Sequence, residues 1–366
     1  MGTLTTNLAG LILRNPILTA AGPMARDGAT LLKAAKGGAG GLVAKTISLK
    51  PAEVPRPNMA VLNRRRTVGL LNTELWSDIP AKQWLQTEYK KAKLAELPLI
   101  GSVGYTPEEV TELAPQMVAA GCDAIEFSVH YIKEVDQIAK ALREVVEVLL
   151  FAKLSPHSSE DLAKLARTIE QYVDGFTAIN TLGPTLHIDI ETGRPFLGNY
   201  GWLSGPALKP LAIRCVADIC KAVKKPVIGV GGVSTGADAV EYIMAGATAI
   251  QVCTQAILRG HTIYGKIAKD IEDWLRQHDH DSIEDIKGLA LAHIPSTISK
   301  IQAVPVIDHV ACNLCGICVQ TCVYDALTIQ ENEIELDVDK CYGCGLCTSI
   351  CPRFAIAFQE TAWSDF

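Results

Sequence analysis

Two runs of four cysteines near the C-terminal end constrain this chain more than any other feature. They read Cys312-x-x-Cys315-x-x-Cys318-x-x-x-Cys322 and Cys341-x-x-Cys344-x-x-Cys347-x-x-x-Cys351-Pro352. Duplicated runs of this kind are typical of a ferredoxin module, in which three cysteines of one run bind a 4Fe–4S cluster and the fourth reaches across to the other cluster. The spacing therefore predicts one cluster on Cys312, Cys315, Cys318 and Cys351, and a second on Cys341, Cys344, Cys347 and Cys322.

Zinc is the alternative ligand for these cysteines, because paired C-x-x-C motifs also form tetrahedral zinc sites. Eight cysteines at this spacing exceed what a zinc ribbon needs, which favours iron–sulfur clusters. We therefore expect a small ferredoxin-like α+β domain over residues 301–366 that carries single electrons.

The composition indicates a globular protein of a reducing compartment. With 366 residues, 48% of them hydrophobic, the chain is long and apolar enough to bury a large core. Its net charge of −6 argues against nucleic acid as the main partner. Cluster-binding thiolates need reducing conditions, and neither a signal peptide nor a long apolar span is visible. We therefore expect a soluble, cytoplasmic protein without a membrane partner.

From Leu8 to about Arg259 the chain alternates short apolar runs with amphipathic stretches, which is the rhythm of a parallel β-sheet covered by helices, and we expect this domain to span residues 1–300. Eight runs predict strands: Pro16–Ala20, Gly41–Thr46, Leu97–Val103, Ala124–Val129, Val148–Leu154, Gly175–Asn180, Lys225–Gly231 and Ala247–Cys253. Helical patterns between them include Pro107–Ala120, Ser159–Tyr172 and Ala207–Val223. Eight strands with intervening helices predict a (β/α)8 TIM barrel, and an open doubly wound sheet is the alternative. Residues 294–308 lack clear periodicity and are interpreted as the linker to the cysteine-rich domain.

Polar residues follow nearly every predicted strand at its C-terminal end, where such barrels place their active sites. They include Lys45, Ser102, Glu126, Ser128 and Lys153. After the seventh run, a glycine-rich segment from Gly229 to Gly236 is typical of a phosphate-binding loop, because its backbone amides can approach a phosphate and a following helix start favours the charge. A dinucleotide fingerprint is the alternative, but the acidic residue that it requires is missing.

An FMN cofactor in the predicted barrel would connect its chemistry to the electron transfer of the cysteine-rich domain. Iron–sulfur clusters pass single electrons, carbon compounds are usually reduced by two, and a flavin exchanges either number. Lys153, at the end of its strand, is then predicted to face the flavin and to stabilise the negative charge of the reduced ring.

Several segments resemble the dihydroorotate dehydrogenase superfamily, and most closely the FMN and iron–sulfur portion of dihydropyrimidine dehydrogenase, including the bacterial subunit of that type. The matching segments are Asn15-Pro-Ile-Leu-Thr-Ala-Ala-Gly22, Ala44-Lys45-Thr46, Leu71-Asn72-Thr-Glu74-Leu-Trp-Ser77, Phe151-Ala-Lys153-Leu-Ser-Pro, Ile179-Asn180-Thr181, Leu203-Ser204-Gly205-Pro206 and Ile250-Gln-Val-Cys253-Thr254. The paired cysteine runs also follow the barrel in the same order.

The resemblance implies two sets of ligand-binding residues. FMN would be held by Ala20, Gly22, Lys45, Thr46, Ser102, Ser128, Lys153, Asn180, Thr181, Gly205, Gly232, Cys253 and Thr254. A pyrimidine ring would be hydrogen-bonded by Asn72, Glu74, Asn180 and Thr181, because carboxamides match the alternating donors and acceptors of an imide.

One segment departs from the family pattern. Where the family has an Asn, a Ser and a catalytic Cys before a long loop, this chain has Ser128, His130 and Tyr131, and most of the loop is missing. We predict that His130 or Tyr131 replaces the thiol as proton donor. Lys153 is the third predicted catalytic residue. Because the proton donor differs from that of the family, we expect an altered substrate. The alternative is that both side chains only pack at the barrel mouth. The run Arg64-Arg65-Arg66 is either a solvated loop or a site for an anionic substrate group.

The combined prediction is an FMN- and iron–sulfur-dependent oxidoreductase that reduces, or in reverse forms, a C=C bond conjugated to a carbonyl. Electrons would enter through the clusters from an NAD(P)H-dependent flavoprotein subunit or a ferredoxin, within a homo- or hetero-oligomer, because no nicotinamide site is visible. The alternative is an electron-transfer subunit whose FMN relays electrons within a larger complex and has no substrate of its own. Free space above the flavin would favour the enzyme, and a mouth filled by His130, Tyr131 or Trp76 would favour the relay.

Overall fold

The computed structural model describes residues 4–63, 68–128, 135–156, 161–294 and 303–358. It divides into two compact units, Met1–Leu291 and Ala292–Phe366. The predicted boundary between residues 300 and 301 lies outside the described residues, so the boundary stays a prediction. Within the part of the chain that is described, no helix is both long and apolar enough to cross a membrane.

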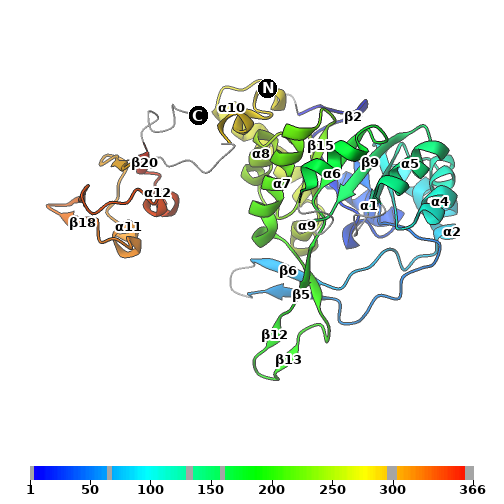
Figure 1. Cartoon of the computed structure of the whole chain (residues 1–366), viewed down its shortest axis with the longest axis horizontal. Coiled ribbons are helices and arrows are strands. Elements are labelled where there is room, and N and C mark those ends of the chain that lie inside the picture. Colours follow the sequence, from blue (N-terminus) through cyan, green and yellow to red (C-terminus); the bar gives the residue numbers. More distant parts are fainter. Residues whose placement is uncertain (1–3, 64–67, 129–134, 157–160, 295–302, 359–366) are drawn as a thin grey trace. The chain divides into compact units, whose positions relative to one another are not determined.

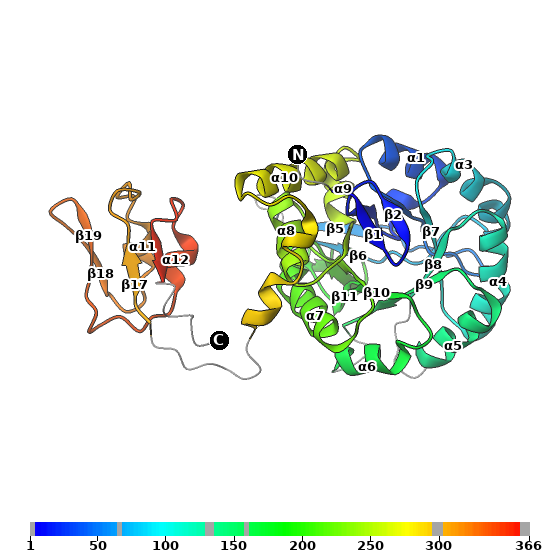
Figure 2. The ribbon, with the colours of Figure 1, turned by 90° about the horizontal axis from the view of Figure 1, so that it is seen from above.

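The first unit is a barrel of eight parallel strands surrounded by helices (Figure 2). In sheet order the strands are β3 (Ile17–Thr19), β16 (Ala249–Val252), β15 (Val227–Val230), β10 (Gly175–Ala178), β9 (Leu149–Leu154), β8 (Ala124–Ser128), β7 (Leu99–Val103) and β4 (Leu42–Val43). A parallel bridge between Leu18 and Gly41 joins the first and last strands. Each predicted apolar run contains one of these strands, which confirms the TIM barrel and excludes the open doubly wound sheet.

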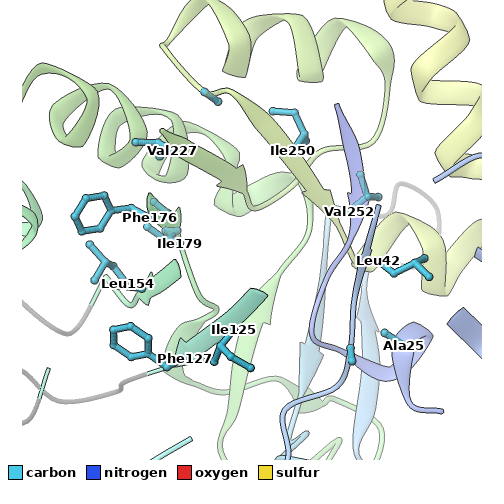
Figure 3. Close-up of a cluster of buried hydrophobic side chains, with 14 of the residues drawn as sticks. Ala25, Leu42, Ile125, Phe127, Leu154, Phe176, Ile179, Val227, Ile250 and Val252 are labelled. Carbon is cyan, nitrogen blue, oxygen red and sulfur yellow. The ribbon is translucent and has the colours of Figure 1, made fainter. Parts of the chain in front are cut away.

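Alternation along the strands separates two apolar cores, because successive side chains of a strand point to opposite faces. One set, which includes Leu42, Ile125, Phe176 and Ile250, packs with the surrounding helices (Figure 3). The other set fills the barrel interior and consists of Leu18, Val43, Ile100, Ala124, Phe151, Ile228 and Ala249. Leu8 and Leu13, from the antiparallel pair β1 (Thr6–Leu8) and β2 (Leu11–Leu13), join this interior cluster.

The helices of the first unit are amphipathic and pack around the barrel. They are α1 (Gly28–Lys36), α2 (Ala81–Gln83), α3 (Tyr89–Lys93), α4 (Pro107–Ala119), α5 (Val135–Val145), α6 (Leu162–Ile169), α7 (Lys209–Ala222), α8 (Gly236–Met244), α9 (Thr254–Arg259) and α10 (Ile263–Gln277). In α4, Thr106 caps the helix by accepting a hydrogen bond from the Glu109 amide, and Pro107 occupies the first turn. The helix then buries Val110, Leu113, Ala114 and Met117, as its 3.6-residue period requires.

A four-stranded antiparallel sheet, absent from the sequence prediction, is inserted between barrel elements. Its order is β11 (Leu182–Thr185), β14 (Gly201–Ser204), β6 (Gly69–Asn72) and β5 (Met59–Leu62). Between β11 and β14 runs a hairpin of β12 (Ile188–Asp189) and β13 (Arg194–Pro195), and Figure 1 shows β5, β6, β12 and β13 together beyond one end of the barrel. The strands are short and partly exposed, so they carry little of the apolar periodicity that marks a buried strand.

The second unit is a small α+β fold built from two similar halves. Its elements are β17 (Pro305–Ile307), α11 (Ile317–Thr321), β18 (Leu327–Gln330), β19 (Glu333–Leu336), α12 (Leu346–Ile350) and β20 (Ile356–Phe358). β17 pairs with β20, and β18 pairs with β19. The interpretation of residues 294–308 as a linker is therefore wrong for Pro305–Ile307, whose proline starts a strand where its missing amide hydrogen costs little. The ferredoxin-like architecture is confirmed.

Candidate functional site

A cavity of about 740 Å³ opens at the C-terminal ends of the barrel strands. This volume lies in the range of roughly 300–1,000 Å³ that small-molecule and cofactor sites occupy. Its wall contains all but one of the predicted FMN residues, namely Ala20, Gly22, Lys45, Thr46, Ser128, Lys153, Asn180, Thr181, Gly205, Gly232, Cys253 and Thr254, and both remaining predicted substrate residues, Asn72 and Glu74. The exception, Ser102, is fully buried behind the wall, where its hydroxyl lies 2.8 Å from that of Thr46.

Strand alternation explains why these residues meet. Two positions after Val43 of the interior core comes Lys45, and two positions after Phe151 comes Lys153. The same step leads from Ala124 to Glu126 and from Ala249 to Gln251. Each strand thus places an apolar side chain low in the barrel and a polar one above it on the same face. This polar layer lies at the floor of the cavity, where Lys45, Lys153 and Gln251 line the wall and Glu126 lies behind it.

Lys153 and its neighbours form a buried polar network below the cavity. The Lys153 ammonium lies 3.5 Å from Glu126 Oε1 and 3.4 Å from Gln251 Oε1. Glu126 Oε2 accepts hydrogen bonds from Gln251 Nε2 at 2.6 Å and from Thr177 Oγ1 at 2.9 Å. Lys153 therefore presents a positive charge at the cavity floor, with a fully buried carboxylate behind it.

Lys45 provides the second cation of the wall and is held by Glu74, whose Oε2 lies 2.7 Å from its Nζ. The other oxygen of Glu74 accepts a hydrogen bond from Asn58. Asn72 is the last residue of β6 in the inserted sheet. Its side-chain nitrogen donates to Trp202 O at 3.0 Å, and its side-chain oxygen accepts from the Glu74 backbone amide at 3.2 Å. These contacts fix the side chains of Asn72 and Glu74 in defined orientations.

Asn180 is likewise held by hydrogen bonds to its neighbours. Its Nδ2 donates to Ser128 Oγ at 3.2 Å, and its Oδ1 accepts from the Thr181 amide at 2.9 Å. A carboxamide has two hydrogens on nitrogen and two lone pairs on oxygen. Asn180 and Asn72 can therefore each form further hydrogen bonds with a bound ring.

Glycine-rich loops converge at one end of the cavity. Gly205 has φ +89° and Gly232 has φ +75°, a region that favours glycine. A Cβ on Gly232 would lie 2.8 Å from Gly205 O, and a Cβ on Gly205 would lie 3.2 Å from Thr254 Cγ2. Three of the predicted FMN-binding residues, from separate loops, are thus direct neighbours, and glycine at positions 205 and 232 allows this close approach.

The helix start that lines this end belongs to α9 rather than to α8. Cys253 and Thr254 are part of the cavity wall. The first turn of α8 is instead closed by a capping box between Thr235 and Asp238, and Asp238 also accepts from the amides of Ser234 and Thr235. Burial raises the pKa of the Cys253 thiol, with the ammonium groups of Lys153 and Lys45 opposing it.

Several residues of the wall are not among the site residues predicted from the sequence. Gln251 interrupts an apolar strand at an inward position, and that interruption is a readable signal. Tyr105 and Glu109 come from the turn after β7 and the start of α4, where Glu109 accepts hydrogen bonds from Ser48 Oγ and the Tyr105 amide. Burial, reinforced by the Glu109 charge, raises the pKa of the Tyr105 phenol far above its ordinary value. No sequence pattern announces this cluster.

Three predicted features lie outside the described residues: His130, Tyr131 and the run at residues 64–66. Trp76, proposed as a possible plug, is described. It lines the cavity wall, and its ring packs edge-on against Tyr105 with centroids 5.5 Å apart.

The cysteine runs of the second unit occupy equivalent places in its two halves. Leu314 and Gly343 donate their amides to Cys312 Sγ and Cys341 Sγ, each at 3.4 Å. Ala326 and Ala355 likewise donate to Cys322 Sγ at 3.3 Å and to Cys351 Sγ at 3.4 Å. Amide donors of this kind suit sulfurs that carry negative charge as cluster ligands.

The four cysteines predicted for the first cluster, Cys312, Cys315, Cys318 and Cys351, line one small cavity. This convergence of three cysteines of one run with the last cysteine of the other is the arrangement that the spacing predicts for a cluster shared between the two runs.

Comparison with known proteins gives matches in both units. A family model described as "Dihydroorotate dehydrogenase" matches residues 115–275, and one described as "4Fe-4S dicluster domain" matches residues 311–355. The catalytic subunit of dihydroorotate dehydrogenase B (NAD(+)) from Methanothermobacter thermautotrophicus is 35% identical over 306 residues, covering 78% of this chain and 98% of the relative. The subunit of the same name from Methanosarcina mazei is 38% identical over 301 residues, covering 77% and 94%.

Proposed function

This chain belongs to the dihydroorotate dehydrogenase family, and we propose that it uses FMN and two 4Fe–4S clusters to reduce, or in reverse to form, a C=C bond conjugated to a carbonyl. Family membership and the 4Fe–4S domain make it an oxidoreductase with an electron-transfer module. The observation that carries the finer proposal is the single cavity wall that unites the predicted cofactor residues with the predicted substrate residues.

The wall fits FMN on two counts. The converging glycines at Gly205 and Gly232, with Thr254 beside them, leave backbone space for a phosphate. Lys153 offers a cation at the floor, where charge appears on the reduced ring. FMN supplies hydride to carbon and exchanges single electrons with iron–sulfur clusters.

We propose a substrate with an uncharged imide-like ring, similar to that of dihydropyrimidine dehydrogenase. Asn72 and Asn180 face the same cavity and keep donors and acceptors for a ring. The charged side chains that the structure describes in the wall are Lys45, Lys153, Glu74 and Glu109, which sum to zero. Lys45 forms an ion pair with Glu74, and Lys153 is proposed to interact with the flavin. Among these four groups, neither lysine is therefore available to bind a substrate carboxylate.

The altered proton donor remains part of the proposal. His130 or Tyr131 would protonate the α-carbon in place of the family's thiol, which suggests a substrate that differs from those of the relatives. An enzyme, unlike a pure electron relay, needs substrate-binding groups beside its cofactor, and Asn72 and Asn180 line the same cavity as the predicted FMN residues.

An electron-donor partner follows from the same account. The relatives are named catalytic subunits, and this sequence contains no dinucleotide fingerprint in a strand–turn–helix context. We propose an NAD(P)H-dependent flavoprotein subunit or a ferredoxin as donor. Anaerobic mixing of the purified protein with NADH alone should leave the flavin oxidised, and rapid bleaching would contradict this part.

The function is tested by anaerobic reoxidation. The protein is reduced with dithionite, excess reductant is removed, and recovery of flavin absorbance is followed after addition of uracil or orotate. Uracil or a related neutral ring should reoxidise the flavin faster than its carboxylated counterpart. Recovery with orotate alone would contradict the neutral-substrate proposal, and no recovery with any unsaturated carbonyl compound would favour the relay.

A further inference from the structure

Glu126 is the most deeply buried charged residue of the cavity floor, with an exposed fraction of 0%. It does not line the cavity itself and has no place in the proposed transfer of hydride or proton. A carboxylate costs free energy to bury unless several donors satisfy it. Its position below the cavity therefore needs a physical account.

The donors to Glu126 come from separate barrel strands. Thr177 of β10 and Gln251 of β16 both donate to Oε2, and Lys153 of β9 approaches Oε1. In chain order, Glu126, Thr177 and Gln251 stand on the fourth, sixth and eighth barrel strands. Side chains from alternate strands form one layer inside such a barrel. Glu126 thus joins a single layer across the barrel axis.

The carboxylate also determines how the Gln251 amide is oriented. A carboxylate accepts only, so the Gln251 group 2.6 Å from it must be the NH₂ group. Gln251 Oε1 is consequently turned to Lys153, whose Nζ lies 3.4 Å away. Gln251 and Lys153 both line the cavity, whereas Glu126 reaches the cavity only through them.

The distances to Lys153 are long for a charge-assisted pair, which usually spans about 2.7–2.9 Å. At 3.5 Å from Glu126 and 3.4 Å from Gln251, the ammonium stands off from its partners and remains part of the cavity wall. Lys45 differs, because it lies 2.7 Å from Glu74. Lys153 is therefore available to a ligand in the cavity while a negative charge sits behind it.

From this arrangement we infer that Glu126 is a positioning residue, which orients Gln251 and offsets part of the positive charge of Lys153. By offsetting this charge, Glu126 limits how strongly the reduced flavin is stabilised relative to the oxidised flavin. The inference rests on the proposed binding of FMN above Lys153. A cation at the floor stabilises the anionic reduced ring, and a buried anion behind that cation weakens the effect, because charges interact strongly in a low-dielectric interior.

The test is the two-electron midpoint potential of the bound flavin in Glu126→Gln, which removes the charge at nearly constant shape. The potential should rise, with a shift in the reduction equilibrium on the order of tenfold, equivalent to about 30 mV for two electrons. Thr177→Val is the matched control, because it removes a hydrogen bond to the same carboxylate oxygen but no charge. Its reduction equilibrium should change less than about threefold.

A purely structural role for Glu126 would lower the thermal stability of Glu126→Gln and leave the potential at the wild-type value, and that result would overturn the inference. A lowered potential would overturn it as well. Glu126→Gln removes the carboxylate beside Lys153, and this variant could fail to fold for that reason. In that case the midpoint potential of the double variant Lys153→Met/Glu126→Gln is compared with that of Lys153→Met. The double variant should have the higher potential. A wild-type protein that releases no FMN would instead contradict the proposed function on which the inference depends.

Discussion

Lys45 and Glu74 form an ion pair of 2.7 Å that joins a predicted flavin residue to a predicted substrate residue. Lys45 comes from the end of a barrel strand and Glu74 from the segment after the inserted sheet. Their side chains are only 6% and 17% exposed, so solvent screens the pair weakly. The pair therefore ties the inserted sheet to the barrel at the cavity.

A double-mutant cycle should measure a favourable coupling energy between Lys45 and Glu74. Glu74→Gln leaves a buried ammonium without its carboxylate, and we expect a loss of about 2 kcal/mol in the free energy of unfolding. Lys45→Met and the double variant complete the cycle, measured by chemical denaturation. The double variant should lose less than the sum of the single losses, with a coupling of about 1–3 kcal/mol. If the loss in the double variant equals the sum of the two single losses, the ion pair contributes nothing to the free energy of unfolding.

Replacement of Lys153 by Ala should lower the midpoint potential of the flavin, opposite in sign to Glu126→Gln. The ammonium offsets charge that appears only on reduction, so its removal weakens the reduced form more than the oxidised form. The reduction equilibrium should shift on the order of tenfold or more, about 30 mV for two electrons. An unchanged potential with FMN still bound would place Lys153 away from the ring.

Asp238 should confer a pH-dependent part of the stability. Burial alone would raise the pKa of its carboxyl, but hydrogen bonds from Lys209, Ser234 and Thr235 and the Lys209 charge hold that pKa below the ordinary value. A carboxyl with a lowered folded-state pKa stabilises the fold above its unfolded pKa of about 3.9, and the contribution disappears as the pH falls through the folded value.

Asp238→Asn is therefore expected to cost about 2 kcal/mol of unfolding free energy at pH 7, the scale of hydrogen bonds to a charged group. The difference from wild type should shrink below a pH of about 4. Denaturation series at several pH values measure it, with Asp218→Asn, an exposed helix position, as control. A constant difference from neutral to acid pH would contradict the assigned role of the charge.

The proton donor can be identified before any variant is made. If His130 donates the proton, turnover should decline above the ordinary histidine pKa of about 6.5, whereas a tyrosine donor, with an ordinary pKa of about 10, should remain active across neutral pH. His130→Ala or Tyr131→Phe should then lower turnover on the order of a hundredfold while reduction of the flavin through the clusters persists. Full activity in both variants would assign the proton to another group.

The barrel could be predicted because each buried strand is a short apolar run, such as Ala247–Cys253, and nearly every run has polar residues at its C-terminal end. Because side chains alternate between the two faces of a strand, the sequence also predicts that Lys45 and Lys153 point into the barrel. The inserted sheet escaped prediction because β5 and β11 are short and half-exposed.

Long-range contacts in the site were equally inaccessible from the sequence. Glu126 and Gln251 are 125 positions apart, and nothing in either segment indicates that their side chains meet. The pairing of Asn58 with Glu74 depends in the same way on the inserted sheet, which sets the path of the intervening chain. Pro305–Ile307 is predicted as part of a linker because its segment contains prolines and lacks clear periodicity, and its partner strand, β20, lies some fifty residues later.

Cofactor analysis of the anaerobically purified protein shows whether the chain binds FMN and iron–sulfur clusters. The flavin released by denaturation is identified by mass, and iron and zinc are quantified on the same sample. The account predicts one FMN and about eight iron atoms per chain, with zinc far below one equivalent. FAD in place of FMN, or zinc in place of iron, would contradict it.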